Sequence, residues 1–226
     1  MIARVSASVL ASLLAASAAV PLGAQGAPAA TEPGASQLAL VNLPAKDRAN
    51  LRVSSPAFGA GGDIPFENTQ YKGNVFPGLS WSAGPAGTRS YVIIMQDGDA
   101  MRNGAPIFHW SMVNIPPSIT TLEPKMSQPP AGAQYGPNIR GPNQVYMGPH
   151  TPPGPKHRYH FQVFALDITI PADATSNYES LTGAMNGHVL ASGELHQRDA
   201  PGMACPSPIS SPPASTCPFM AAVSDS

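Results

Sequence analysis

The sequence SYVIIMQDGD, residues 90–99, is the run that most strongly indicates a fold class. Its central positions, residues 91–95, are all large and apolar, which is typical of a strand buried on both faces. We therefore expect this strand to lie in the interior of a sheet. Asp97 and Asp99 follow at its end, and the alternation of side chains along a strand would place both carboxylates on the same side.

Shorter strand signals lie on both sides of this run, separated by turn residues. The chain of 226 residues contains 27 Pro and 21 Gly, which suits many short strands joined by tight turns and argues against a helical bundle. One segment has a helical pattern, because Ser176 can cap a run that continues from Leu181 to Leu190. We expect a mainly β domain of mostly antiparallel strands, with a helix near the C-terminus. The further strand candidates are residues 51–54, 79–82, 109–115 and 158–167.

The composition limits the class of partner. Lys and Arg number 12 against 13 Asp and Glu, so the formal net charge is −1 and no global field favours nucleic acid or an anionic membrane. Hydrophobic residues make up 42% of the chain and charged residues 11%, which is enough apolar material for one sizeable core. We expect one domain, no bound nucleic acid and no cofactor.

Residues 1–24 have the pattern of an export signal. Arg4 precedes a run of small and apolar residues, Val5 to Val20, and a small residue provides a cleavage point before Gln25. A membrane anchor is the competing interpretation, but the run is shorter than the roughly 20 residues that span a bilayer. We expect a cleaved signal peptide, no transmembrane span, and a mature protein that is periplasmic or secreted.

Two segments flank the expected domain, which covers residues 49–198. Residues 25–48 begin with many Ala, Pro and Gly residues and are expected to form a flexible leader. Residues 199–226 are a Pro- and Ser-rich tail that contains the only two cysteines, Cys205 and Cys217. In an oxidising compartment these two would form a disulfide, which by chain entropy would contribute about 3 kcal/mol. Two cysteines without a C-x-x-C motif do not make a zinc site, so we expect no metal.

Polar side chains gather at the ends of the predicted strands. His109 begins one strand, and His157 and Tyr159 share a face of another by the period of two. The loop of residues 146–153, with its Gly and Pro residues, is suited to forming the wall of a pocket. Each feature also has a purely structural explanation, because aspartates can end a strand and cap turns, and His109 can be a hydrogen-bonded core residue.

Taken in order, these motifs resemble the phosphatidylethanolamine-binding protein family, also called Raf kinase inhibitor-like proteins, in its bacterial branch. The resemblance covers roughly residues 50–198, and the ordered set is specific although each motif alone is weak. Residues 185–191 resemble the C-terminal helix of the bacterial members. The motifs are SPAF (55–58), IP (64–65), LSW (79–81), PAGT (85–88), DGDA (97–100), HW (109–110), VNIP (113–116), GP (148–149), PP (152–153), HRY (157–159) and FALD (164–167).

The resemblance implies a β-sandwich-like fold with a pocket for a phosphate-like anion or a phospholipid head group, and no catalytic residues. A carboxylate beside an imidazole favours the protonated ring. We therefore expect a charged histidine to surround the anion together with the Tyr159 hydroxyl and backbone N–H groups of the loop at Gly148. Gly98 departs from the family pattern, in which proline usually separates the two aspartates, and should leave this turn less rigid. The positions that match the family's pocket are Asp97, Asp99, His109, Gly148, Pro149, His157 and Tyr159.

Two other functions stay open. Two carboxylates and two histidines could bind zinc or another divalent metal with an open position for water, although the sequence has no H-E-x-x-H or G-x-S-x-G motif. Aspartate–histidine pairs could also perform acid–base chemistry on a bound ester or phosphoester. Stoichiometric metal in the purified protein would favour such an enzyme. An exported relative could instead inhibit a protease or bind another partner protein, and the resemblance is also compatible with a homodimer.

Overall fold

The structure is a computed structural model that describes residues 31–46 and 49–198. The expected signal peptide and the pair Cys205 and Cys217 lie outside the described residues. Among the residues it describes, no helix is long and apolar enough to cross a membrane.

The strands are β1 (Ala49–Asn50), β2 (Val53–Ser54), β3 (Leu79–Trp81), β4 (Ser90–Arg102), β5 (Ala105–Ile115), β6 (Thr121–Leu122), β7 (Gln134–Tyr135), β8 (Arg158–Leu166) and β9 (Val189–Arg198). The helices are η1 (Ala35–Gln37), α1 (Ala39–Asn42), η2 (Phe66–Asn68), η3 (Ala172–Thr175) and α2 (Tyr178–Met185).

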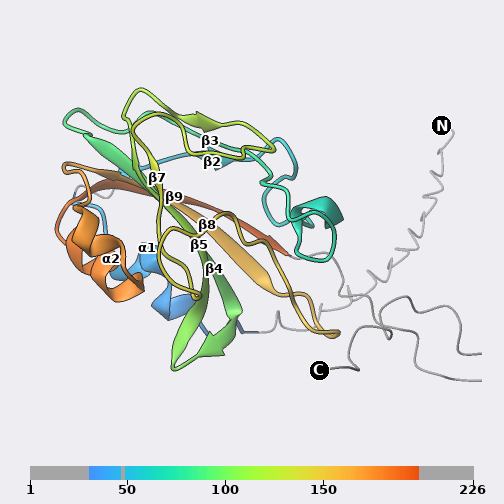
Figure 1. Cartoon of the computed structure of the whole chain (residues 1–226). Coiled ribbons are helices and arrows are strands. Elements are labelled where there is room, and N and C mark those ends of the chain that lie inside the picture. Colours follow the sequence, from blue (N-terminus) through green and yellow to red (C-terminus); the bar gives the residue numbers. More distant parts are fainter. Residues whose placement is uncertain (1–30, 47–48, 199–226) are drawn as a thin grey trace, which may run out of the picture. The chain divides into compact units, whose positions relative to one another are not determined.

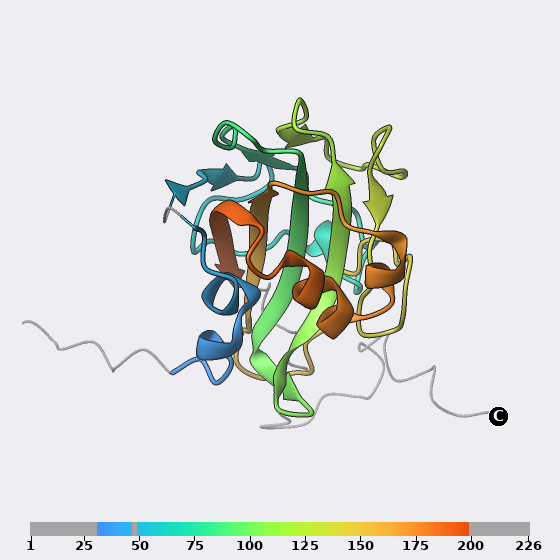
Figure 2. The same ribbon diagram turned by 90° about the vertical axis from the view of Figure 1, so that its left-hand side faces the viewer.

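The strands form two sheets, which confirms the expected fold class. The large sheet has the order β1-β9-β8-β4-β5-β7 and the small sheet the order β2-β3-β6. Of the strand pairs described, β1 with β9 is parallel and the others are antiparallel. The small sheet covers one face of the large sheet, and α1 and α2 cover the other (Figures 1 and 2).

Strand β4 lies in the interior of the large sheet, as its apolar sequence predicts. Tyr91, Ile93 and Met95 are buried in the core between the two sheets. Val92 and Ile94 are buried in the second core, beneath the helices. Both halves of the core therefore depend on the alternation of this one strand.

Residues 32–46, called the N-terminal strap below, belong to the helical layer of the domain (Figure 2). They include η1 and α1, and they bury Ala39 and Leu43 in the core beneath the helices. The strap falls within residues 25–48, for which the composition predicts a flexible leader. Its path is defined because its apolar side chains complete the helical layer of the core.

The C-terminal helix is shorter than expected and a strand follows it. The side-chain oxygen of Asn177 accepts the backbone N–H of Ser180 at 2.8 Å, so the N-cap is Asn177 rather than Ser176. The helix stops before Gly187, which takes a φ of 76°, a conformation that favours glycine. The expectation that the helix continues to Leu190 is therefore wrong. The apolar residues after the glycine belong to β9, where they are buried against β8.

Candidate functional site

Asp97 and His157 form a hydrogen-bonded pair at the point where the pairing of β4 with β8 ends. Asp97 lies on β4 directly opposite Tyr159 of β8. His157 precedes Tyr159 by two residues, so its side chain reaches the same face. The Nδ1 atom of His157 donates to Oδ2 of Asp97 at 2.8 Å, and the carboxylate is buried. The structure thus brings two predicted residues together, and Asp97 fixes the orientation of the imidazole.

His109 reaches the same region because β5 contains a bulge. Met95 of β4 pairs with Trp110, and Gln96 pairs with Phe108. His109 is therefore an extra residue with no partner in this register. Bulges re-aim a side chain out of the regular alternation and are frequent beside functional sites.

The ring of His109 is buried, and its Nδ1 donates to the carbonyl oxygen of Met147 at 3.3 Å. Burial lowers the pKa of His109 below its ordinary value. The charge of Asp97 and the backbone groups of Met147 and Gly148 oppose this effect without outweighing it. Burial therefore favours the neutral form of the His109 ring. With its proton on Nδ1, the neutral ring can accept a hydrogen bond at Nε2.

Tyr159 supports the site from beneath. Its side chain is buried, and its ring packs edge-on against His109 with 5.1 Å between the ring centroids. Its hydroxyl is 3.1 Å from Oγ1 of Thr151, a residue that lines the cavity described below. Tyr159 itself is not among the lining residues, so it contributes through the two neighbours that it holds.

Gly148 and Pro149 shape the wall of the site. The N–H of Gly148 donates to Oδ1 of Asn74 at 2.7 Å, and its carbonyl accepts from Nε2 of Gln70 at 2.7 Å. The carbonyl of Pro149 accepts the backbone N–H of Gln70 at 2.9 Å. A Cβ at position 148 would overlap with the carbonyl oxygen of Asn68, so only glycine fits this approach. The N–H of Gly148, which we expected to face an anion, is thus used within the protein.

The carboxylate of Asp99 does not join the hydrogen-bonded pair of Asp97 and His157 but binds Arg158. The register of β4 against β5 shifts between Asp97 and Met101, so the alternation expected from the sequence does not continue to Asp99. Asp99 accepts three bonds from Arg158: from the backbone N–H at 2.7 Å, from Nε at 2.8 Å and from a terminal guanidinium nitrogen at 2.5 Å. Burial raises the pKa of Asp99, but these bonds outweigh it and the pKa lies below its ordinary value. Asp99 is not among the residues that line the cavity described below.

A cavity of about 390 Å³ lies beside the Asp97–His157 pair. It combines the two predicted histidines with cationic, polar and apolar side chains from the surrounding loops. Its lining residues are Gln70, Asp97, Ala100, Arg102, Ile107, His109, Ile139, Arg140, Met147, His150, Thr151, Pro152 and His157.

Two arginines of this cavity were missed by the sequence analysis. Arg102 ends β4, and Arg140 is held by its backbone N–H, which donates to Oδ1 of Asn138 at 2.7 Å. Asn138 in turn donates to the carbonyl of His109 at 3.1 Å, which ties the loop to β5. Within residues 31–46 and 49–198, neither guanidinium forms an ion pair with a carboxylate. No local sequence signal marks these arginines, because Arg102 stands alone at the end of a strand and Arg140 stands alone in a loop.

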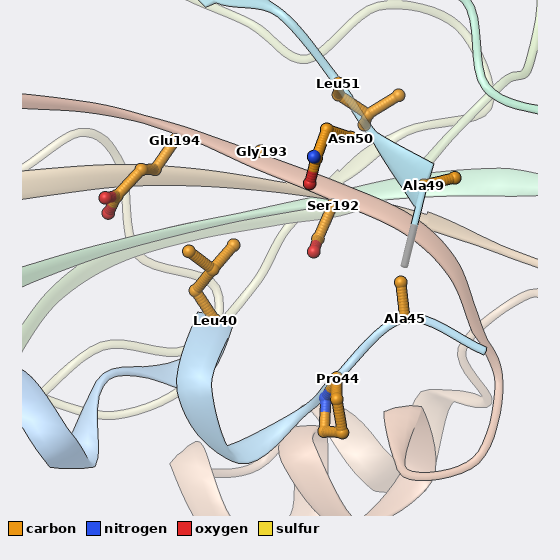
Figure 3. Close-up of a pocket in the computed structure, with 9 residues that line it drawn as sticks. All are labelled: Leu40, Pro44, Ala45, Ala49, Asn50, Leu51, Ser192, Gly193 and Glu194. Atoms are coloured by element: carbon orange, nitrogen blue, oxygen red, sulfur yellow. The ribbon is translucent and has the colours of Figure 1, made fainter. Parts of the chain in front are cut away.

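Another hollow, of about 460 Å³, lies between α1 and β9 (Figure 3). Leu40 reaches into it from the helix, and Ser192 and Glu194 reach into it from the strand. It has one carboxylate and no cationic lining residue, so it does not suit an anion. In the part of the chain that is described, no group of three or more His, Cys, Asp or Glu residues is arranged to hold a metal ion.

Comparison with known proteins gives clear relatives. The family model described as phosphatidylethanolamine-binding protein matches residues 54–198. A UPF0098 protein of Methanothermobacter thermautotrophicus is 35% identical over 148 residues, which cover 64% of this chain and 95% of that protein. A Mycobacterium tuberculosis protein named as a lipoprotein, LppC, is 35% identical over 136 residues, or 58% of this chain and 64% of that one. The crystal structure of Escherichia coli YbcL, described as a new member of the mammalian PEBP family, is similar with a TM-score of 0.60 at 28% identity, covering 67% of this chain and 98% of that one.

Proposed function

The chain belongs to the phosphatidylethanolamine-binding protein family, and from this premise we propose that the cavity beside Asp97 and His157 binds a small phosphate-type anion, such as a phospholipid head group. Family membership supports ligand binding in general. The choice of an anion is supported by the side chains around the cavity.

The observation that carries this proposal is the excess of cationic groups around one cavity. Arg102 and Arg140 line it without an ion pair to any carboxylate of the described chain. A guanidinium presents paired N–H donors that match two oxygens of a phosphate group. His157 lines the same space, and Asp97 holds its ring through the hydrogen bond to Nδ1.

The other lining residues favour an ester of phosphate. Ile107, Ile139 and Met147 offer apolar surface to the carbon atoms of an esterified group. The neutral ring of His109 can accept a hydrogen bond from a donor on the ligand, such as an ammonium or hydroxyl group. A phosphorylated head group supplies the anion, the carbon atoms and the donor together.

Calorimetric titration with O-phosphoethanolamine and with inorganic phosphate tests this proposal. We expect His157→Ala and Asp97→Ala to abolish binding while circular dichroism shows an intact fold. Arg140→Gln should weaken binding by on the order of tenfold, since a hydrogen bond to a charged group contributes about 1.5–3 kcal/mol. Arg52→Gln is the matched control, because it removes the same charge from an exposed site that does not line the cavity.

Two results would contradict the proposal. One is the absence of binding at every pH between about 5 and 8, the range in which histidine titrates. The other is equal weakening by Arg140→Gln and Arg52→Gln, which would indicate a general charge effect. Release of free phosphate from the ester during the titration would indicate phosphoester hydrolysis instead of binding alone.

We also propose that the protein acts outside the cytoplasm. The support is the apolar run Val5 to Val20 behind Arg4, together with the name of the mycobacterial relative LppC. N-terminal sequencing of the protein from a periplasmic or culture-medium fraction should begin at Gln25. A mature chain that still begins at Met1 would contradict export by a cleaved signal.

A further inference from the structure

The N-terminal strap is tied to the two central strands on the face opposite the cavity. The backbone N–H of Ala39 donates to Oε1 of Gln96 on β4 at 2.8 Å. The backbone N–H of Leu40 donates to Oε1 of Gln162 on β8 at 2.6 Å. Both glutamines are buried, so the strap satisfies polar groups that would otherwise be costly to bury.

The beginning of the strap lies on the irregular segment of β4 that follows Asp97, residues 98–100, called the turn below. Gly34 donates its backbone N–H to the carbonyl of Gly98 at 2.9 Å. The carboxylate of Glu32 lies over the Cα of Gly98, and a Cβ at position 98 would overlap with Oε1 of Glu32. Gly98 is not among the described glycines with positive φ, so glycine is needed here for space rather than for backbone conformation.

Two cationic side chains hold the Glu32 carboxylate. Oε1 of Glu32 is 2.5 Å from Nε2 of His160, and Oε2 is 3.6 Å from Nε of Arg158. The side chains of Glu32 and His160 are only 11% and 6% exposed. His160 also pairs through Nδ1 with Glu194 at 3.0 Å, and Arg158 is the residue that binds Asp99. The cluster therefore contacts the turn at two residues: Glu32 lies against Gly98, and Arg158 binds Asp99.

The turn itself sets the direction of the Asp97 carboxylate. Oδ1 of Asp97 accepts the backbone N–H groups of Asp99 at 2.9 Å and Ala100 at 3.1 Å. Oδ2 of the same carboxylate accepts from His157 at 2.8 Å. A change in the path of this turn would therefore rotate the group that orients the imidazole in the cavity.

We propose that Glu32 is a positioning residue of the site: docked on Gly98, it holds the turn that aims Asp97 at His157 and thereby sets the affinity of the cavity for its anion. The statement about affinity rests on the proposed function, whereas the statement about the turn does not. The strap thus contributes to the site from the opposite face of the sheet, through the contact of Glu32 with Gly98.

The anchor depends on pH through His160. Burial lowers the pKa of His160, but the hydrogen bond with Glu194 and the charges of Glu32 and Glu194 outweigh burial, and the pKa lies above its ordinary value of 6.5. The attraction between the protonated ring of His160 and the carboxylate of Glu32 is therefore complete below pH 6.5, and it is lost as the pH rises through the raised pKa of His160. The other ionisable groups that face this cluster are Arg158, beside Glu32, and His196, whose ring stacks on His160 at 6.1 Å.

The test compares Glu32→Gln and Gly98→Ala with Lys46→Met, which breaks an exposed ion pair at the other end of the strap. The first measurement is the hydrogen-exchange rate of the Asp99 and Ala100 amides without ligand. The second is the affinity for sulfate, a probe of constant charge, from about pH 6 to 9, where a histidine with a raised pKa loses its proton. We expect Glu32→Gln and Gly98→Ala each to speed exchange and weaken sulfate binding by on the order of tenfold, and Lys46→Met to change neither.

A double variant distinguishes docking from general loosening. In the background of Glu32→Ala, adding Gly98→Ala should have little further effect, because the carboxylate that the new methyl group would displace is absent. The difference in affinity between wild type and Glu32→Gln should narrow as the pH rises. Unchanged exchange in Glu32→Gln, or an equal change in Lys46→Met, would overturn the proposal. If the wild type does not bind sulfate at all, the proposed function fails, and the exchange rates alone decide whether Glu32 holds the turn.

Discussion

The two histidines of the cavity differ in what their ring nitrogens do. His157 is partly exposed and directs Nδ1 to a carboxylate, Asp97, whereas His109 is buried and directs Nδ1 to a carbonyl group, that of Met147. A carboxylate can compensate a positive ring, but a carbonyl in a buried site cannot fully do so. The pair therefore offers a ligand two rings in different environments: the ring of His157 is held by a carboxylate, and the ring of His109 is buried, which favours its neutral form.

The neutral state of His109 predicts a specific loss of stability in acid. Its pKa is lowered by burial, so the unfolded chain takes up a proton at a higher pH than the folded protein does. The stability that depends on the neutral ring is present above the unfolded pKa near 6.5 and is lost as the pH falls through the folded pKa.

Urea unfolding at a series of pH values between about 4 and 8 measures this effect. Below pH 6.5 the free energy of unfolding of the wild type should fall more steeply than that of His109→Gln, by up to about 1.4 kcal/mol per pH unit. His150→Gln, at an exposed histidine of the same cavity, is the control and should keep the wild-type slope. Parallel slopes for wild type and His109→Gln would show that His109 is not buried in the neutral form.

At the scale of the elements, irregularities of two strands build the site. The bulge in β5 turns His109 toward Tyr159, and the register shift after Asp97 moves Asp99 to Arg158. Ideal strands would have kept Asp97 and Asp99 on one face and would have left Arg158 without its bonds to Asp99. The two departures from alternation thus place His109 beside the cavity and place Asp99 with Arg158, outside the cavity lining.

The cap of α2 gives a prediction at the same scale. Asn177→Ala should lower the free energy of unfolding by about 1 kcal/mol, because its side chain satisfies the otherwise unpaired N–H of Ser180. Ser176→Ala is the control, since its hydroxyl contacts another exposed hydroxyl at 3.1 Å, and it should change stability by less than about 0.5 kcal/mol. Chemical denaturation of both variants decides between the two caps. A larger loss for Ser176→Ala would assign the cap to Ser176.

At the scale of the whole domain, the large sheet has an apolar core on each of its two faces, and each core must be covered by a second layer. The small sheet covers one face, and α2 and the N-terminal strap, which includes α1, cover the other (Figure 1). The strap adds apolar side chains to the core beneath the helices, so its removal would expose that core to water.

This arrangement predicts a contrast between two neighbouring residues of the strap. Leu43 is 4% exposed and Val41 is 54% exposed. Leu43→Ala should lower the free energy of unfolding by about 2–5 kcal/mol, because it leaves a cavity in the core. Val41→Ala should change it by less than about 0.5 kcal/mol. Equal small effects in denaturant unfolding would mean that the strap is a detachable leader, as its composition suggests.

Much of the fold follows from local sequence patterns. The apolar run at residues 91–95 determines a central strand because a strand buried on both faces has no polar positions. The abundance of Pro and Gly favours tight turns, but the expectation of short strands holds only outside the centre of the large sheet, where β4, β5, β8 and β9 have 13, 11, 9 and 10 residues. The period of two likewise places His157 and Tyr159 on one face, and the ordered motifs identify the family.

Only the tertiary structure decides how the site is assembled. The bulge at His109, the diversion of Asp99 to Arg158 and the approach of Arg140 depend on which strands and loops become neighbours. The helical pattern after Ser176 gives way to β9 because its last apolar residues are buried by pairing with β8. A single sequence contains the secondary-structure propensity of each segment and the period of its apolar residues. Strand register, bulges and loop contacts are set by packing between segments far apart in the chain.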